Sequence, residues 1–161
     1  MKLFGKAAGA AKFATSIVVA AAAVVSASSP AQAAGNASEQ IRRLDIMLMV
    51  TALRCRNTAD NFNAEYGMFT TSQMANLQAA NAELRASLSR QYGAAGANRQ
   101  MDRISTTMAN AYGLGHPWLS CRELKQVTRD LSQVRGRATL AEAADQLLGA
   151  QNSPQYAYAR R

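Results

Sequence analysis

The chain has few of the residue types on which metal sites and many active sites depend. Its 161 residues include one His, one Trp and two Cys. A single His cannot form a histidine metal site, and neither a D-x-D-x-D-G loop nor an H-E-x-x-H helix occurs. The C-x-x-C pair of thioredoxin-like sites and the C-x-x-C-H motif of haem attachment are absent as well. We therefore predict no metal site and no cofactor.

Other signatures of catalysis and of β-structure are also missing. The sequence has no G-x-S-x-G nucleophile motif, no phosphate-binding G-x-x-x-x-G-K-[ST] and no G-x-G-x-x-G. No apolar–polar alternation typical of strands and no internal repeat is found. These absences predict an all-α protein, and they single out no catalytic residues.

The first 33 residues have the three parts of a secretory signal peptide. Three lysines and no acidic residue precede an apolar stretch at residues 13–27, and Ala31-Gln32-Ala33 offers small residues where a signal peptidase cleaves. The apolar stretch is short for a membrane span, which needs about 20 residues. An uncleaved anchor is the alternative. We predict a periplasmic or secreted protein with no membrane span after cleavage.

Charge limits the expected partners. After removal of residues 1–33, 15 Lys and Arg face 10 Asp and Glu, an excess of five positive charges. Such an excess on an exported chain is compatible with weak binding to anionic surfaces. Nucleic acid is not an expected partner outside the cytosol.

Apolar residues recur at helical spacing through most of the remaining chain. In the first segment Ile41, Leu44 and Leu48 follow this spacing, while Arg42 and Asp45 fall off that face. Asn36, Thr70, Ser120 and Thr139 each precede a Glu or Gln by three residues, which is typical of a helix N-cap. The expected helices are 38–63, 70–91, 98–112, a fourth from residue 121 that ends before Gly136, and a short fifth from residue 139.

The predicted architecture is an up-and-down bundle of four main helices plus a short C-terminal helix. Gly-containing turns separate the helices, notably at Gly67 and Gly93. We place the bundle domain at residues 34–149. Residues 150–161, which hold two arginines and no apolar periodicity, are predicted to be a disordered basic tail.

Cys55 and Cys121 lie on the apolar faces of the first and fourth predicted helices. Two cysteines in an exported chain most simply form a disulfide. A link across 66 residues would stabilise the fold by about 4 kcal/mol. The alternative is a reactive Cys121 thiol near a helix N-terminus, with His116 close in sequence.

The stretch GLGHPWLSCREL, residues 113–124, holds the His, the Trp and the second Cys. Its structural interpretation is a corner of the fold in which His116 and Trp118 cover the disulfide. Its functional interpretation is a small pocket or partner surface, because loops often carry function. The candidate residues for that surface are His116, Trp118, Tyr112 and Glu123.

The segments IRRLDIMLMVTALRCR and MANAYGLGHPWLSCRELK together resemble a group of small exported proteins of unknown function from sphingomonad-type alphaproteobacteria. The resemblance implies export and a two-cysteine helical domain, and it implies no activity. Some members carry the label adenosylhomocysteine hydrolase, an enzyme with a nicotinamide-binding parallel sheet. No such unit is present in this sequence.

Three functions remain open. The first is a non-catalytic binding or accessory module of the cell envelope that acts on a partner protein or ligand. The second is a small hydrolase with His116 as acid/base and a nearby carboxylate such as Glu123. The third is a binder of anionic envelope surfaces that uses the arginines and the basic tail.

Overall fold

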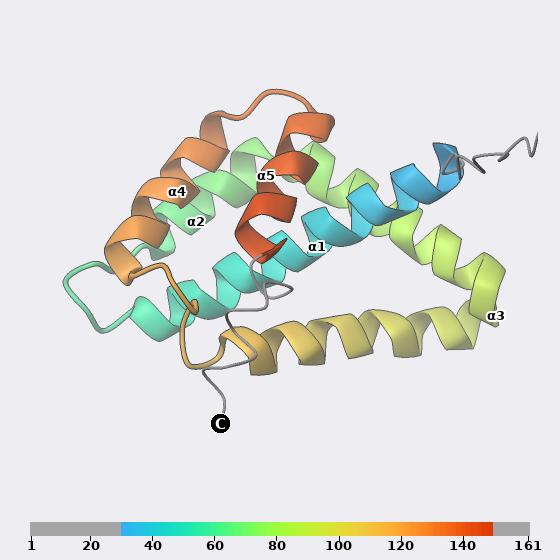
Figure 1. The fold of residues 1–161 in the computed structure, drawn as a ribbon, viewed down its shortest axis with the longest axis horizontal. Coiled ribbons are helices and arrows are strands. Elements are labelled where there is room, and N and C mark those ends of the chain that lie inside the picture. Colours follow the sequence, from blue (N-terminus) through green and yellow to red (C-terminus); the bar gives the residue numbers. More distant parts are fainter. Residues whose placement is uncertain (1–29, 150–161) are drawn as a thin grey trace, which may run out of the picture.

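The protein is all-α, with its helices gathered around the first one (Figure 1). The computed structural model describes residues 30–149, so most of the predicted signal peptide and the whole predicted tail lie outside the described residues. No strand occurs in that range, and the expected all-α fold held by one disulfide is confirmed. The helices are α1 (Pro30–Cys55), α2 (Asn63–Ser72), α3 (Met74–Tyr112), α4 (Cys121–Gln133) and α5 (Arg137–Gly149).

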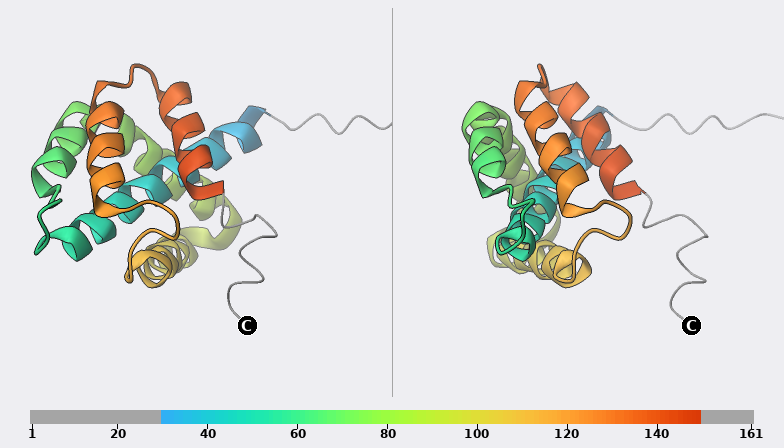
Figure 2. Two further views of the ribbon diagram at one scale, coloured as in Figure 1. Left: turned by 60° about the vertical axis from the view of Figure 1, so that its left-hand side comes forward. Right: turned by 90° about the vertical axis from the view of Figure 1, so that its left-hand side faces the viewer.

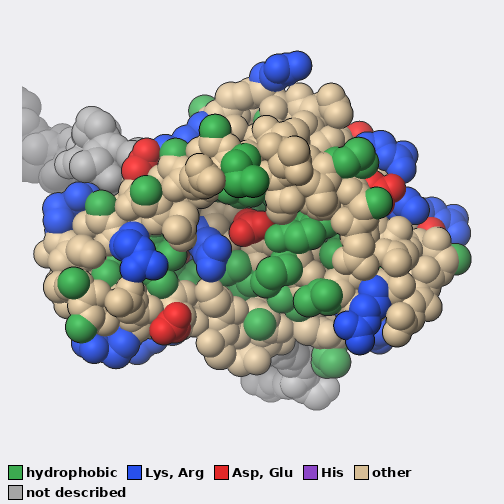
Figure 3. Space-filling view, turned by 180° about the vertical axis from the view of Figure 1, so that it is seen from behind, with side chains coloured by type: hydrophobic (Ala, Val, Ile, Leu, Met, Phe, Trp, Pro, Cys, Tyr) green, Lys and Arg blue, Asp and Glu red, His purple; other side chains and the backbone are tan. Residues whose placement is uncertain are grey.

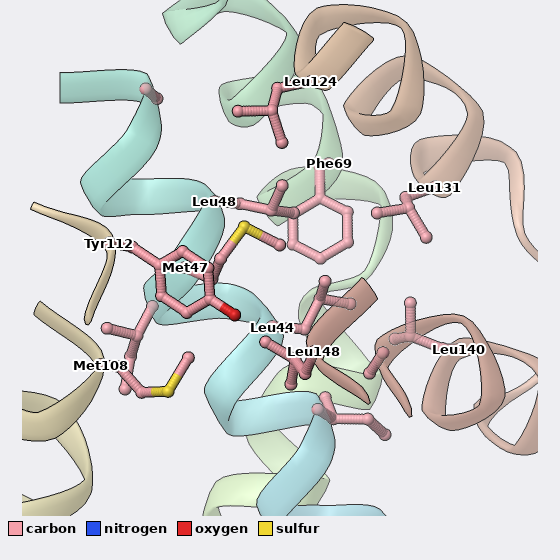
Figure 4. Packing of buried hydrophobic residues seen from close by; sticks show 14 of the residues in the cluster. Leu44, Met47, Leu48, Phe69, Met108, Tyr112, Leu124, Leu131, Leu140 and Leu148 are labelled. Carbon is pink, nitrogen blue, oxygen red and sulfur yellow. The ribbon is translucent and has the colours of Figure 1, made fainter. Parts of the chain in front are cut away.

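The predicted apolar face of α1 forms the centre of the core. Ile41, Leu44 and Leu48 are fully buried at the expected steps of three and four residues. Helices α3 and α5 pack against α1, and α2 packs beside α4 (Figure 2). Side chains from all five helices meet on this face, among them Phe69 of α2 and Leu140 of α5 (Figure 4). Burial of this shared apolar surface is the main term that holds the bundle together.

Both ends of α1 differ from the prediction. The helix begins at Pro30 and runs through Asn36, so Asn36 is not an N-cap. It ends at Cys55, where the Thr58 hydroxyl donates to the Cys55 carbonyl oxygen at 2.8 Å. The chain then turns and buries Phe62 in the core. Helical spacing predicted a longer helix, to residue 63, because Phe62 lies beyond the turn and also faces the core.

The segment predicted to be a break around Gly67 is helix α2 instead. Gly inside a helix costs only about 1 kcal/mol relative to Ala. Burial of Phe69, which is fully inaccessible to solvent, offsets that cost. The Thr70 hydroxyl donates to the Gly67 carbonyl oxygen within α2 and is not an N-cap. Tertiary packing therefore outweighs the local signal here.

The junction between α2 and α3 is Gln73, whose side chain is buried. Its Nε2 donates to the carbonyl oxygens of Leu131 and Val134, both at 3.0 Å. These carbonyls lie at the end of α4, where acceptors are short of helical partners, although the Leu131 oxygen also accepts the Val134 backbone N–H at 3.3 Å. One amide thus closes α4 and fastens it to the α2–α3 junction.

The break predicted near Gly93 is confirmed as a sharp bend inside α3. Gly93 has φ +70° and ψ 170°, a conformation that is almost restricted to glycine. The bend divides α3 into a first arm, residues 74–92, and a second arm, residues 94–112. The second arm starts directly after Gly93, and not at residue 98 as predicted.

The expected capping box at the start of α4 is confirmed. The Glu123 backbone N–H donates to the Ser120 hydroxyl, and the Ser120 backbone N–H donates to the Glu123 carboxylate at 2.7 Å. Gly136 has φ +85° and separates α4 from α5, as predicted. Helix α5 begins at Arg137, so Thr139 lies inside it and is not its cap.

Candidate functional site

Cys55 and Cys121 form the predicted disulfide, with an S–S distance of 2.00 Å and Cα atoms 5.8 Å apart. The bond joins the end of α1 to the start of α4. Cys55 is 1 % exposed, so the link is part of the core. Neither cysteine is a free thiol. The structure therefore gives these residues a stabilising role.

His116 lies over the disulfide corner with both ring nitrogens engaged. Nδ1 accepts the Leu119 backbone N–H at 3.2 Å, which assigns the proton of the neutral ring to Nε2. Nε2 in turn lies 3.3 Å from the Leu147 carbonyl oxygen and donates to it. Burial lowers the pKa of His116, although the contact with Leu147 acts in the opposite direction. The ring is held neutral, and neither nitrogen is directed at solvent.

The structure brings three of the four predicted surface residues together. The His116 ring stacks on Tyr112 with centroids 5.3 Å apart, and it meets Trp118 edge-on at 4.3 Å. Tyr112 is fully buried, and burial raises its pKa to about 12. The cluster joins α3 to the loop before α4, and it is chiefly an internal contact.

Glu123, the fourth predicted residue, has a different role. Its carboxylate accepts both the backbone N–H and the hydroxyl of Ser120, each at 2.7 Å. These hydrogen bonds lower the pKa of Glu123. The carboxylate caps α4 and contacts neither nitrogen of His116.

A hollow of about 270 Å³ lies between the loop and the disulfide, with His116 and Leu119 among its lining residues.

A second hollow lies between α1 and the second arm of α3, and we call it the α1–α3 groove. Its volume is about 350 Å³. In the view from behind, hydrophobic side chains surround a hollow with acidic and basic side chains at its edge (Figure 3). The groove is lined by Arg42, Asp45, Ile46, Met49, Ser105, Thr106 and Ala109.

Asp45 is the acidic residue of the α1–α3 groove. It accepts the Tyr66 hydroxyl at 3.0 Å, and one of its oxygens lies 3.6 Å from Arg42 Nη1. Burial raises the pKa of Asp45, while Tyr66 and Arg42 act to lower it. Burial and the neighbouring Asp45 also raise the pKa of Tyr66. A half-buried charge with a shifted pKa beside a hollow is a common feature of binding sites.

Arg42 is incompletely satisfied in the groove. Its Nη2 donates to the Ser105 hydroxyl at a long 3.3 Å. Its Nε is buried and has no acceptor among the described residues. Buried donors are nearly always paired in folded proteins, so an open guanidinium marks a place where a further acceptor is favoured.

The apolar part of the groove continues along α1 toward its C-terminal end. Ile46, Met49 and Leu53 recur at steps of three and four residues, so they share one side of the helix. Met49 is 40 % exposed and Leu53 is 52 % exposed. On the α3 side, Ser105 and Ala109 are small and allow a partner to approach closely. Because Ile46 is only 2 % exposed, the uncovered apolar surface beside Arg42 consists of Met49 in the groove and Leu53 next to it.

A further hollow between α1 and α5 differs in that its polar groups are already paired. Arg43 contacts Glu39 at 2.6 Å. The Gln40 side chain donates to Asp145 at 3.1 Å. Its volume is about 410 Å³, which is larger than that of the α1–α3 groove. Within residues 30–149, the buried side-chain polar atoms that lack a partner are Arg42 Nε and the Tyr112 hydroxyl, and neither residue lines this hollow. We therefore place the candidate site in the α1–α3 groove.

Sequence reasoning missed the groove, although its residues were visible. The helical spacing places Arg42 and Asp45 off the apolar face of α1 and predicts no site there. Their spacing to Ile46 and Met49 places these charged and apolar residues on the same side of the helix, and this was the pattern that could have indicated a site. Only the position of the second arm of α3 makes that side a groove.

Neither composition nor comparison assigns an activity. The described part of the chain contains no cluster of three or more His, Cys, Asp or Glu side chains suited to a metal ion. Across residues 30–149, no helix is both long and apolar enough to cross a bilayer. No family model, curated protein or solved structure matches the chain. The resemblance to exported two-cysteine proteins stays a prediction.

Proposed function

We propose that the protein is an exported, non-catalytic binding module whose α1–α3 groove takes an amphipathic helix of a partner protein. The observation that carries this proposal is the Arg42 guanidinium, whose buried Nε has no acceptor and which lies beside the exposed Met49. A partner helix with apolar side chains and one carboxylate would cover Met49 and pair with the exposed part of the Arg42 side chain, which is 30 % accessible.

The chemistry of the groove favours a helix over a small ligand. The exposed apolar residues Met49 and Leu53 lie four positions apart on α1, which matches the spacing of anchors on a docking helix. Methionine is a flexible, polarizable side chain that adapts to partner surfaces. Arg42 supplies the charge that selects an acidic residue and sets the orientation of the docked helix.

Export is part of the proposal. The Cys55–Cys121 disulfide is compatible with a location outside the cytosol, where such links persist. The signal peptide predicted at residues 1–33 supports the periplasm or the exterior. The proposal therefore places the partner in the cell envelope or beyond it.

The hydrolase alternative has less support. A histidine that acts as acid/base needs a free ring nitrogen within reach of a substrate proton, and a carboxylate needs a free oxygen. Both nitrogens of His116 are used within the fold, and Glu123 is used in the α4 cap. The third alternative, a binder of anionic envelope surfaces, rests on a different part of the molecule.

Site-specific photo-crosslinking tests the groove in the exporting cell. A photoreactive amino acid is placed at Met49 or, as the matched control, at Met68 of α2, which is 49 % exposed. We expect one protein to be crosslinked from position 49 and not from position 68. Equal crosslinking from both positions, or crosslinking only to a second copy of this chain, would contradict the proposal.

Affinity measurements then test the chemistry. The crosslinked helix of the partner is made as a peptide and titrated against the purified protein. Arg42→Gln is expected to weaken binding at least about tenfold, because a charge-assisted hydrogen bond is lost. Arg43→Gln, which alters the opposite flank of α1, is the matched control and is expected to bind normally. Equal affinities for both variants would overturn the role of Arg42.

A further inference from the structure

The stretch around the bend of α3 is rich in arginine. Residues 30–149 contain 13 Lys and Arg and 10 Asp and Glu, an excess of three. Residues 84–103 contain four arginines and one aspartate, which is the same excess. Figure 3 shows basic side chains at the end of the molecule at which α3 bends and at the opposite end of the same face. The four residues are Arg85, Arg90, Arg99 and Arg103.

These four arginines form no ion pair within the described part of the chain. All four are exposed. Arg85 donates to the Asn98 side-chain oxygen, which ties the two arms together and leaves the charge of Arg85 unneutralised. Arg54, Arg56 and Arg135 likewise form no ion pair within residues 30–149, whereas Arg43 and Arg129 each contact a carboxylate. A solvated helix face would mix both signs, whereas no acidic residue occurs between positions 84 and 101.

The tip of the bend presents an aromatic ring among small residues. Residues 90–95 are exposed without interruption, and Tyr92 is 48 % exposed. Gly93 turns the chain at positive φ, and Ala94 and Ala95 follow it. Tyrosine is enriched at the headgroup level of bilayers, where its ring is buried and its hydroxyl is solvated. Guanidiniums bind phosphate oxygens in a bidentate manner.

We infer that the α3 bend docks on an anionic bilayer, with its arginines on lipid phosphates and Tyr92 at headgroup level. This inference does not depend on the α1–α3 groove. Helix α1 enters the fold at the same end of the molecule, because a Cβ on Gly35 would lie 3.8 Å from the Ser87 hydroxyl of the first arm. The predicted signal peptidase site, after Ala33, is therefore at this end as well. Docking there would hold the rest of the molecule away from the bilayer.

Vesicle sedimentation with the exported protein tests the inference. The probes are phosphatidylglycerol–phosphatidylethanolamine vesicles and neutral phosphatidylcholine vesicles. We expect binding to the anionic vesicles alone, which falls as salt is raised. A basic residue near an anionic surface contributes about fivefold in affinity, so Arg90→Gln, Arg99→Gln and Arg103→Gln combined should weaken binding on the order of 100-fold.

The matched control removes the same charge elsewhere. Arg54, Arg56 and Arg135 are exposed and lie away from the bend, so changing all three to Gln leaves an equal net charge. This control should lose much less affinity than the variant of the bend. Equal losses would overturn the inference, as would a loss of binding on changing Arg160 and Arg161 to Gln. Circular dichroism verifies that each variant is folded.

Two further measurements test how deeply residue 92 enters the bilayer and which chemical class of ligand the bend binds. Tyr92→Trp should be quenched by vesicles with brominated acyl chains, whereas the unaltered protein, whose single Trp is Trp118, should not. Absence of quenching at position 92 would contradict the docking geometry. Binding to polyphosphate or to duplex DNA as tightly as to anionic vesicles would also overturn it, because the partner would then be a soluble polyanion.

Discussion

His116 Nε2 lies 3.3 Å from the carbonyl oxygen of Leu147 and joins the loop before α4 to the last turns of α5. Since the same ring stacks on Tyr112, three separate parts of the chain meet at one imidazole. The Nε2 contact is possible in both protonation states, whereas the Leu119 backbone N–H can donate only to an unprotonated Nδ1. The hydrogen bonding of this ring therefore depends on pH.

Acidification should weaken the fold through His116. Burial lowers the pKa of His116 below its ordinary value of 6.5, so the unfolded chain takes up a proton at a higher pH than the folded chain does. The stability that the neutral ring supplies is complete above pH 6.5 and is lost as pH falls through 6.5 toward the folded pKa. We expect the unfolding free energy, measured with urea, to fall between pH 7.5 and pH 5.5.

The control for this prediction is His116→Gln. The variant should be less stable at every pH because its packing is altered, but its unfolding free energy should change less over the same interval. Parallel pH profiles for the two proteins would show that other groups cause the acid sensitivity.

Loss of the disulfide should cost about 4 kcal/mol of unfolding free energy, because the unfolded chain is freed from a 66-residue loop. Cys55→Ser and Cys121→Ser should be destabilised by similar amounts, since each breaks the same bond. Denaturant titrations with and without dithiothreitol measure this. The reductant should destabilise the unaltered protein and leave both variants unchanged, and any other pattern would contradict a purely shared role.

Gln73→Ala should destabilise the protein by about 2–3 kcal/mol. The substitution removes three side-chain hydrogen bonds, including the one that Gln73 accepts from Asn76, and it leaves the Val134 carbonyl oxygen without its donor. Gln78→Ala, at an exposed position of the same helix, should stay within about 0.5 kcal/mol of the unaltered protein. Equal stability of the two variants would show that the amide does not hold α4.

Two Gly→Ala substitutions should have opposite signs. At Gly67, inside α2, an added Cβ meets nothing within 4 Å, so Ala should stabilise the helix by about 0.5–1 kcal/mol. At Gly93 the space is also open, but φ is +70°, so Ala should destabilise the fold by about 1–3 kcal/mol. Thermal unfolding of both variants measures the contrast, and shifts of the same sign would contradict the bend at Gly93.

Several features of the fold could be predicted because neighbours in sequence determine them. The apolar face of α1, the capping box at Ser120 and the turn at Gly136 each depend on residues within a few positions of one another. The disulfide was predictable because the chain has two cysteines, both on apolar faces of expected helices. Such features depend on helical spacing, on hydrogen bonds within one turn and on simple pairing.

Other features depended on contacts that spacing does not encode. Helix α2 exists around Gly67 because Phe69 is buried against residues distant in sequence. The N-cap signals at Asn36, Thr70 and Thr139 were wrong because the same short pattern also occurs inside helices, where packing extends the helix past it. The candidate groove was not predicted, because it requires the second arm of α3 beside α1.

The sequence by itself determined the all-α class, the apolar face of the central helix, the pairing of Cys55 with Cys121 and the position of the bend in α3. Only the tertiary structure decided that both nitrogens of His116 form hydrogen bonds within the fold, that Arg42 lines a hollow with one donor unpaired, and that four arginines around the bend of α3 form no ion pair with the described residues. The physical reason is the distance in sequence over which each kind of interaction acts. Backbone preferences and apolar periodicity act over a few residues, whereas burial and hydrogen-bond partners are set by helices that are distant in sequence and adjacent in space.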